Sequence, residues 1–335
     1  MKRVSGVLSL LAKVLGGKSS MSIYQHVTEF AGQPVTEWES ESGIQDPNGT
    51  IYRLGISYEE TEEGQQWIDK FAAFLDDPAS GQVTGLVIGD WGILNSSDPE
   101  SNSRLVVEAL VAARARLPHL TAIFFGDIIS EECEISWIRQ SDVSPIFEAY
   151  PALTHFCVRG ADGLSLGTLR HAHLKSLVVQ SGGLGAGVVR EVAAAQLPEL
   201  EHLELWLGDE QYGGNSTVDD LAPILSGQLF PKLRYLGLRD SEKADEIALA
   251  VAQAPIVERI RVLDLSMGTL GDEGAAALLA SPAIAKLELL DIHYHFCSEE
   301  MMKKLESSSV KVDVSDLQKP DEYKGELYRY VAVGE

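Results

Sequence analysis

Residues that would indicate catalysis or membrane insertion are scarce in this sequence. Its 335 residues include only three cysteines, Cys133, Cys157 and Cys297, which lie far apart and form no Cys-x-x-Cys pair. An odd number of scattered cysteines argues against a disulfide framework and favours a reducing compartment. No apolar run approaches the ~20 residues that cross a bilayer. We therefore expect a cytoplasmic protein without stable membrane insertion.

Positive charge is also scarce. The sequence has 27 Lys and Arg residues against 50 Asp and Glu residues, which gives a formal net charge of −23. Such a surface repels the phosphate backbone of nucleic acids and the anionic head groups of lipids. We therefore expect no nucleic-acid partner. Among protein or peptide partners, this charge favours those with basic segments.

The pattern apolar-x-x-apolar-x-apolar recurs along most of the sequence. One copy is Leu200/Leu203/Leu205, and another is Leu233/Leu236/Leu238. The copies begin at Val83, Leu120, Leu153, Leu174, Leu200, Leu233, Ile260 and Leu287. Most of these intervals lie in or near the range of about 20–29 residues that is typical of leucine-rich repeats. Because one unit cannot bury its own apolar edge, the series predicts a stacked solenoid.

Each repeat reads as a short strand, a turn of small residues and a helix that ends near a proline. This order predicts an α/β leucine-rich-repeat solenoid over residues 81–315, a right-handed βα horseshoe with its parallel sheet on the concave face. Residues 21–80 do not fit the repeat, and we interpret them as a non-repeat N-terminal cap. Residues 316–335 contain Leu327, Tyr328 and Val331. They are too apolar for a free tail, so we expect them to pack on the body, with a partner-binding tail as the alternative.

The first twenty residues differ from the rest because they carry Lys2, Arg3, Lys13 and Lys18 and no acidic residue. Apolar residues recur there at helical spacing, which is consistent with a basic amphipathic helix. Three interpretations stay open for residues 1–20: a disordered leader, a weak membrane-surface anchor, and a signal peptide. Lys13 interrupts the apolar stretch, which disfavours the signal peptide.

The repeats resemble the ribonuclease-inhibitor type of leucine-rich repeat, most clearly in the stretch Leu270-Gly-Asp-Glu-Gly-Ala-Ala-Ala-Leu-Leu-Ala280. Two end segments, His26-Val-Thr-Glu-Phe-Ala-Gly-Gln-Pro-Val35 and Arg329-Tyr-Val-Ala-Val-Gly-Glu335, resemble a bacterial family of leucine-rich-repeat proteins named after a Salmonella locus. That resemblance implies a role in a bacterial modification or biosynthetic gene cluster, and it carries over no catalytic residue. The sequence lacks the Asn or Cys that such repeats usually place at the ninth position.

The strand register predicts which side chains a partner would meet. If positions one, four and six of each repeat point into the core, positions three, five and seven point to the concave face. Trp, Tyr and Arg dominate the energetics of protein interfaces, and the predicted face contains all three. The predicted partner-binding residues are His155, Arg159, Gln180, His202, Glu204, Trp206, Tyr235, Arg239, Asp264, Asp291 and His293.

Two patterns resemble metal sites. Leu86-Val-Ile-Gly-Asp-Trp-Gly92 and Phe124-Phe-Gly-Asp127 are similar to strand ends of purple acid phosphatases, in which carboxylates clamp two metals. The other histidine motifs of those enzymes are missing, so a phosphoesterase that uses Asp90 and Asp127 is only an alternative. The stretch His293-Tyr-His295-Phe-Cys297 alternates potential zinc ligands, but His295 falls where the chain turns, so a polar strand end with a half-buried histidine is the better explanation.

The sequence therefore predicts a non-enzymatic scaffold that binds a protein or peptide on its concave face, without a catalytic residue, metal or cofactor. A structural subunit that acts through its end caps is the third interpretation.

Overall fold

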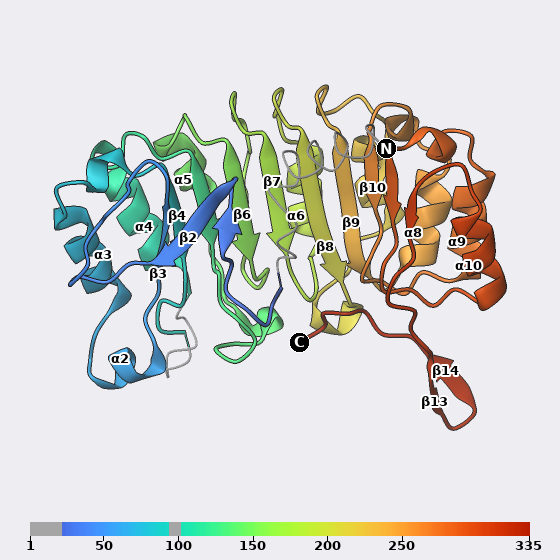
Figure 1. Ribbon diagram of the computed structural model, residues 1–335, viewed down its shortest axis with the longest axis horizontal. Helices are drawn as coiled ribbons and strands as arrows, with labels where there is room; N and C mark the ends of the chain where they lie inside the picture. Colours follow the sequence, from blue (N-terminus) through green and yellow to red (C-terminus); the bar gives the residue numbers. More distant parts are fainter. Residues whose placement is uncertain (1–21, 94–101) are drawn as a thin grey trace, which may run out of the picture.

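A computed structural model describes residues 22–93 and 102–335 of the protein. Its main feature is a twelve-stranded sheet in which the strands follow one another in sequence order. Most of the strands stand side by side in one curved row with helices behind them, and β2 lies in front of this row (Figure 1). Every neighbouring pair is parallel except β1 and β2, which are antiparallel. The predicted basic leader, residues 1–20, lies outside the described residues.

The strands are short, as repeat strands usually are. They are β1 (Glu29–Phe30), β2 (Gln33–Glu37), β3 (Ile51–Leu54), β4 (Gly85–Ile88), β5 (Ala122–Phe125), β6 (His155–Arg159), β7 (Ser176–Gln180), β8 (His202–Gly208), β9 (Tyr235–Ser241), β10 (Val262–Asp264), β11 (Leu289–Asp291) and β12 (Val312–Asp313). A separate hairpin follows, formed by β13 (Asp321–Tyr323) and β14 (Glu326–Tyr328).

A helix returns the chain from most strands to the next, as the proline spacing predicts. The helices are α2 (Tyr58–Glu62), α3 (Trp67–Asp76), α4 (Arg104–Ala112), α5 (Ser144–Ala149), α6 (Ala186–Ala193), α7 (Val218–Leu225), α8 (Ala244–Val251), α9 (Asp272–Ala280) and α10 (Glu299–Glu306). Within the described part of the chain, no helix has both the length and the apolar character needed to cross a bilayer.

The repeat leucines pair in register across the sheet. Leu177 pairs with Leu203, Leu203 with Leu236, and Leu236 with Leu263. These side chains are fully buried in one continuous core between the sheet and the helices. Burying one leucine stabilises the fold by about 1.5–3 kcal/mol, and each repeat gains such a contribution from its own leucines. The predicted leucine-rich-repeat solenoid is confirmed.

The sheet also extends into the region that the sequence assigns to the N-terminal cap. Strand β3 pairs in parallel with β4, with Tyr52 opposite Leu86 and Leu54 opposite Ile88. Helix α3 follows β3 and buries Trp67, Phe71 and Phe74 in the common core. A strand and a helix without the repeat pattern therefore continue the solenoid before residue 81.

Candidate functional site

The second face of the sheet carries the residues that the register assigns to it. Val87, Phe124, Cys157 and Val178 form a separate apolar cluster that does not belong to the core beneath the helices. Alternate residues of one strand thus point to opposite faces, and the predicted register is confirmed. We call this surface the concave face.

Most of the predicted partner-binding side chains on this face are buried. Trp206 and Tyr235 are only 1% and 4% exposed. The expectation that their side chains are open to a partner is therefore wrong for this structure. The buried members of the predicted set are Arg159, Gln180, His202, Glu204, Trp206, Tyr235 and Asp264. The partly exposed members are His155, Arg239, Asp291 and His293.

Buried polar residues on strands β8, β9 and β10 bind one another. The Arg239 guanidinium lies 2.9 Å from a Glu204 carboxylate oxygen and 3.3 Å from an Asp264 oxygen. The Trp206 indole N–H donates to Glu204 at 2.6 Å, and the Tyr235 hydroxyl donates to Asp264 at 2.6 Å. One cation thus bridges two carboxylates, and each carboxylate also accepts a hydrogen bond from an aromatic side chain. We call these five residues the Glu204–Arg239 network.

Within this network, Glu204 stays charged and Tyr235 stays neutral near pH 7, whereas burial raises the pKa of Asp264 above its usual value. Burial would raise the pKa of Glu204, but Arg239 and the adjacent His202 hold it well below its usual range. Burial raises the pKa of the Tyr235 hydroxyl well above its usual value. On β6, burial lowers the pKa of His155 to about 4, which leaves that imidazole neutral. The arrangement therefore serves packing and register better than proton transfer.

The N-terminal segment lies over the first half of the concave face. Residues 22–35, which we call the N-terminal strap, cross in front of the strands near β4–β6 (Figure 1). Val27, Phe30 and Val35 of the strap pack on the apolar cluster of that face. The rings of Phe30 and Phe124 lie 5.7 Å apart between centroids. The strap therefore covers apolar strand residues that would otherwise meet solvent.

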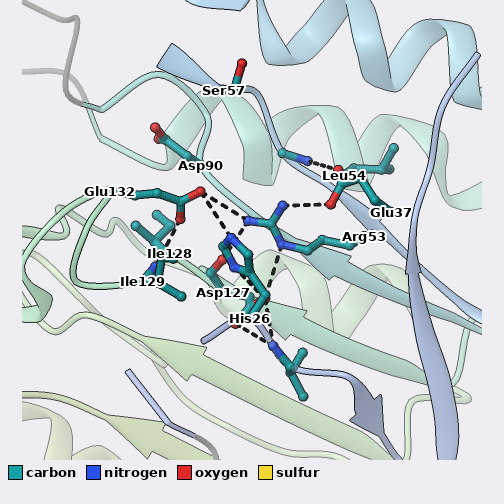
Figure 2. A network of polar contacts seen from close by, with 12 residues as sticks. His26, Glu37, Arg53, Leu54, Ser57, Asp90, Asp127, Ile128, Ile129 and Glu132 are labelled. Atoms are coloured by element: carbon teal, nitrogen blue, oxygen red, sulfur yellow. Dashed lines mark hydrogen bonds and ion pairs between the residues drawn. The ribbon is translucent and has the colours of Figure 1, made fainter. Parts of the chain in front are cut away.

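The strap is held by a partly buried ion-pair network at the ends of β3, β5 and β6, of which Figure 2 shows His26, Arg53, Asp127 and Glu132. The Asp127 carboxylate is fully buried and lies 3.2 Å from the Arg53 Nε and 3.3 Å from the His26 Nδ1. Arg159 approaches the same carboxylate at 3.6 Å, and Glu132 lies 3.3 Å from the second imidazole nitrogen of His26. We call these five residues the Asp127 network.

The ion pairs in this network lower the pKa of the Asp127 carboxyl and raise the pKa of the His26 imidazole. Burial would raise the pKa of Asp127, but the His26 hydrogen bond and the two guanidinium groups hold it below its usual range. Burial would lower the pKa of His26, but its bonds to Asp127 and Glu132 outweigh that effect and raise the pKa to about 9. At neutral pH His26 is therefore a cation that pairs with two carboxylates.

The geometry does not favour the phosphoesterase alternative. The Asp127 oxygens already accept from Arg53 and the Val27 N–H and lie 3.3 Å from the His26 Nδ1, and Asp90 accepts from the backbone N–H groups of Gly92 and Ile93. A metal would have to replace two guanidinium contacts at Asp127. In residues 22–93 and 102–335, no group of three or more His, Cys, Asp or Glu side chains is arranged to hold a metal.

The three potential zinc ligands of the last repeat have other partners. His293 Nδ1 lies 2.7 Å from Asp291. His295 is fully buried; one ring nitrogen lies 3.0 Å from the Val314 carbonyl, and the other accepts from the Cys297 N–H. His295 thus satisfies the backbone of a turn, which is the role that Asn usually plays at this repeat position.

The C-terminal segment contacts the opposite half of the sheet. We call residues 329–335 the C-terminal segment. The Val333 N–H donates to the buried Asp240 carboxylate at 3.0 Å, and the Ala332 N–H donates to the Met267 carbonyl at 2.8 Å. Val333 packs in one cluster with Ile23 and Trp206. The strap and the C-terminal segment therefore contribute to the same apolar cluster as Trp206.

Sequence reasoning singled out Asp127 and Arg159 but missed His26, Arg53 and Glu132. Asp127 lies about a hundred residues after His26, and no local pattern announces their contact. The only signal was the likeness of the segment from His26 to Val35 to a family end segment. The partners became visible only with the three-dimensional path of the strap.

No protein-family model and no curated protein matches the chain. Among solved structures, a Bacteroides fragilis protein determined by the Northeast Structural Genomics Consortium is 33% identical, with a TM-score of 0.75; the match covers 84% of this chain and 77% of that chain. The chain belongs to the family of this Bacteroides protein. A Listeria monocytogenes internalin is 13% identical over 81% of this chain and 74% of its own, with a TM-score of 0.36, too low to support an argument.

Proposed function

We propose that this member of the Bacteroides protein's family is a non-enzymatic scaffold that binds a protein or peptide partner in the bacterial cytoplasm. The observation that supports this best is the state of its buried ionisable groups. Asp127 and Glu204 are each tied to a guanidinium group and to further donors. Such groups stabilise a fold and orient its segments, whereas a catalytic base needs an accessible acceptor. Solenoids of stacked repeats commonly work by presenting an extended surface.

On the concave face, we place partner contact at the partly exposed residues His155, Arg239, Asp291 and His293. The seven buried members of the predicted set support this surface from below. A net charge of −23 favours a partner with basic segments. The resemblance of both end segments to the family named after a Salmonella locus supports a place in a bacterial modification or biosynthetic gene cluster.

Affinity capture from cells that express the protein naturally tests the scaffold. We expect a partner that is captured reproducibly by the tagged wild type, and no hydrolysis of p-nitrophenyl phosphate with added Mn²⁺ or Mg²⁺. A His293→Ala, Asp291→Ala variant should capture less partner if the concave face binds it. Metal-dependent turnover that Asp90→Asn abolishes, without any captured partner, would establish the phosphoesterase instead.

The end-cap interpretation has its own supporting observation. The largest exposed apolar side chains near the C-terminus, Leu327 at 69% and Tyr323 at 61%, lie beyond the last repeat strand. If binding depends on this end, the concave-face variant will capture as much partner as the wild type.

A further inference from the structure

A hairpin of unusual exposure follows the last repeat strand. Strands β13 and β14 pair only with each other, and Asp321 lies opposite Tyr328. The turn between them is formed by Lys324 and Gly325, both with positive φ (55° and 84°), as in a tight two-residue hairpin turn. All six strand residues are exposed, and the hairpin projects away from the body (Figure 1). We call residues 321–328 the hairpin arm.

The arm is attached to the body at both ends. Before it, Gln318 donates its backbone N–H to the His295 carbonyl at 2.8 Å. After it, Arg329 lies 3.3 Å from Asp245, and Val333 is buried beside Trp206. An isolated two-stranded hairpin is marginally stable in water. Attachment at both ends restricts the arm and lowers the entropy that it would lose on binding.

One side of the arm combines aromatic rings with carboxylates. The register places Asp321, Tyr323, Glu326 and Tyr328 on the same face. Tyr328 donates its hydroxyl to Glu326 at 2.7 Å, and the Lys324 ammonium lies 4.8 Å from the centre of the Tyr323 ring. The arm's own lysine thus already demonstrates that a cation can sit against this face. The opposite face carries Leu327 and Glu322.

We propose that the hairpin arm docks a partner protein that presents Lys and Arg side chains to the Tyr323 and Tyr328 rings. Guanidinium and ammonium groups stack on tyrosine rings and pair with carboxylates, and the arm offers both. Leu327 supplies apolar contact at the opposite face. This inference rests on the scaffold function proposed above and adds the arm to the concave face as a second contact for the same partner.

A second copy of this chain is a poor occupant. The arm carries three carboxylates, Asp321, Glu322 and Glu326, against the single ammonium of Lys324. A symmetric contact between two arms would bring like charges together, which is destabilising. A basic partner meets no such repulsion.

Photo-crosslinking in the native cell identifies what the arm touches. Benzoylphenylalanine in place of Tyr323, on the face that the partner is proposed to meet, should give one adduct with a second protein whose contact peptide is rich in Lys and Arg. The same probe at Leu249, an exposed residue of α8, serves as control. An adduct with another copy of this chain, the same adduct at position 249, or no adduct would overturn the proposal.

Isothermal titration calorimetry with the purified partner that the crosslink identifies then measures how much the arm contributes to binding affinity. Tyr323→Ser with Tyr328→Ser should weaken binding about tenfold or more, because tyrosines are frequent hot spots. Asp321→Asn with Glu326→Gln keeps the size of both side chains and should also weaken binding, with a smaller salt dependence. Unchanged affinity in both variants would reject the arm, yet the scaffold function would stand because the partner still binds. Failure of the wild type to bind the purified protein would reject the identified pair.

Discussion

At the scale of single residues, Arg239 is the cation that pairs with two buried carboxylates on the concave face. Its guanidinium pairs with both Glu204 and Asp264, which are only 3% and 4% exposed. A buried charge that loses its partner costs far more than a surface charge does. The arrangement therefore predicts a large difference between this arginine and one at the surface.

Replacing Arg239 with Met should lower the free energy of unfolding by about 3–5 kcal/mol, because two buried carboxylates lose their cation. Urea titration followed by circular dichroism measures this change. Arg261→Met is the matched control, since Arg261 pairs at 3.6 Å with Glu288 at the surface and its loss should cost about 1 kcal/mol or less. Equal costs in the two variants would show that the network is not buried in solution.

His26 predicts how the stability of the fold depends on pH. Its pKa is about 9 in the folded protein and 6.5 by its ordinary value, so protonated His26 favours the folded state. This contribution is complete below pH 6.5, and it declines as the pH rises from 6.5 through about 9. The stability of the wild type should therefore fall over this interval more steeply than that of His26→Gln.

Urea titrations of both proteins at several pH values between 6 and 10 provide the measurement. The difference between the two proteins isolates His26 from the other groups that titrate in the same range, His293 among them, whose pKa is also raised. Parallel curves for the two proteins would show that His26 makes no charged contact with Asp127 or Glu132.

At the scale of elements, the C-terminal segment acts as a structural part of the last repeats. Burial raises the pKa of Asp240 well above its usual value, and this side chain accepts the Val333 N–H. The Val333 side chain fills the cluster around Trp206. The segment thus contributes a hydrogen bond and apolar burial at one position.

Val333→Ser should lower the free energy of unfolding by about 1–3 kcal/mol, since a buried apolar side chain is lost. Leu327→Ser is the control in the exposed hairpin arm, and it should change stability by no more than about 0.5 kcal/mol. Chemical denaturation of both variants decides the matter. A larger loss for Leu327→Ser would mean that the arm packs on the body in solution.

The elements were largely predictable because their signals are local. Helix α7 (Val218–Leu225) follows β8 as the predicted order of strand, turn and helix requires, and the strand triplets pair in the predicted register. The hairpin arm also has a local signal, the Lys324-Gly325 pair between two short strands, which the prediction of a packed tail overlooked. Strand β3 lies in the region interpreted as a non-repeat cap, and its place in the common sheet depends on Tyr52 pairing with Leu86, which no repeat pattern marks.

At the scale of the whole molecule, the burial of the concave face could not be predicted from the repeats. The register correctly places Glu204, Trp206 and Tyr235 on that face. Their exposure, however, depends on contacts between segments distant in sequence, such as that of Ile23 and Val333 with Trp206. Alternation along a strand says which way a side chain points, but not what lies above it.

The net charge of −23 predicts how the stability of the whole molecule depends on salt. Its cations Arg53, Arg159 and Arg239 pair with the buried carboxylates of Asp127, Glu204 and Asp264, so these pairs leave the excess of negative charge at the surface. Mutual repulsion of surface carboxylates destabilises a compact state, and added salt screens it. Going from about 0.01 M to about 0.15 M NaCl shortens the screening length from about 30 Å to about 8 Å.

The midpoint of thermal unfolding should therefore rise with NaCl over this range, as measured by differential scanning calorimetry. Buried pairs are screened much less than surface charges, so the two networks should not reverse the trend. Glu59→Gln, Glu62→Gln and Glu63→Gln together remove three exposed charges near α2, and the midpoint of this variant should respond less to salt. A midpoint that falls as salt is added would mean that attractive surface pairs outweigh the repulsion, and the electrostatic case for a basic partner would lose its physical basis.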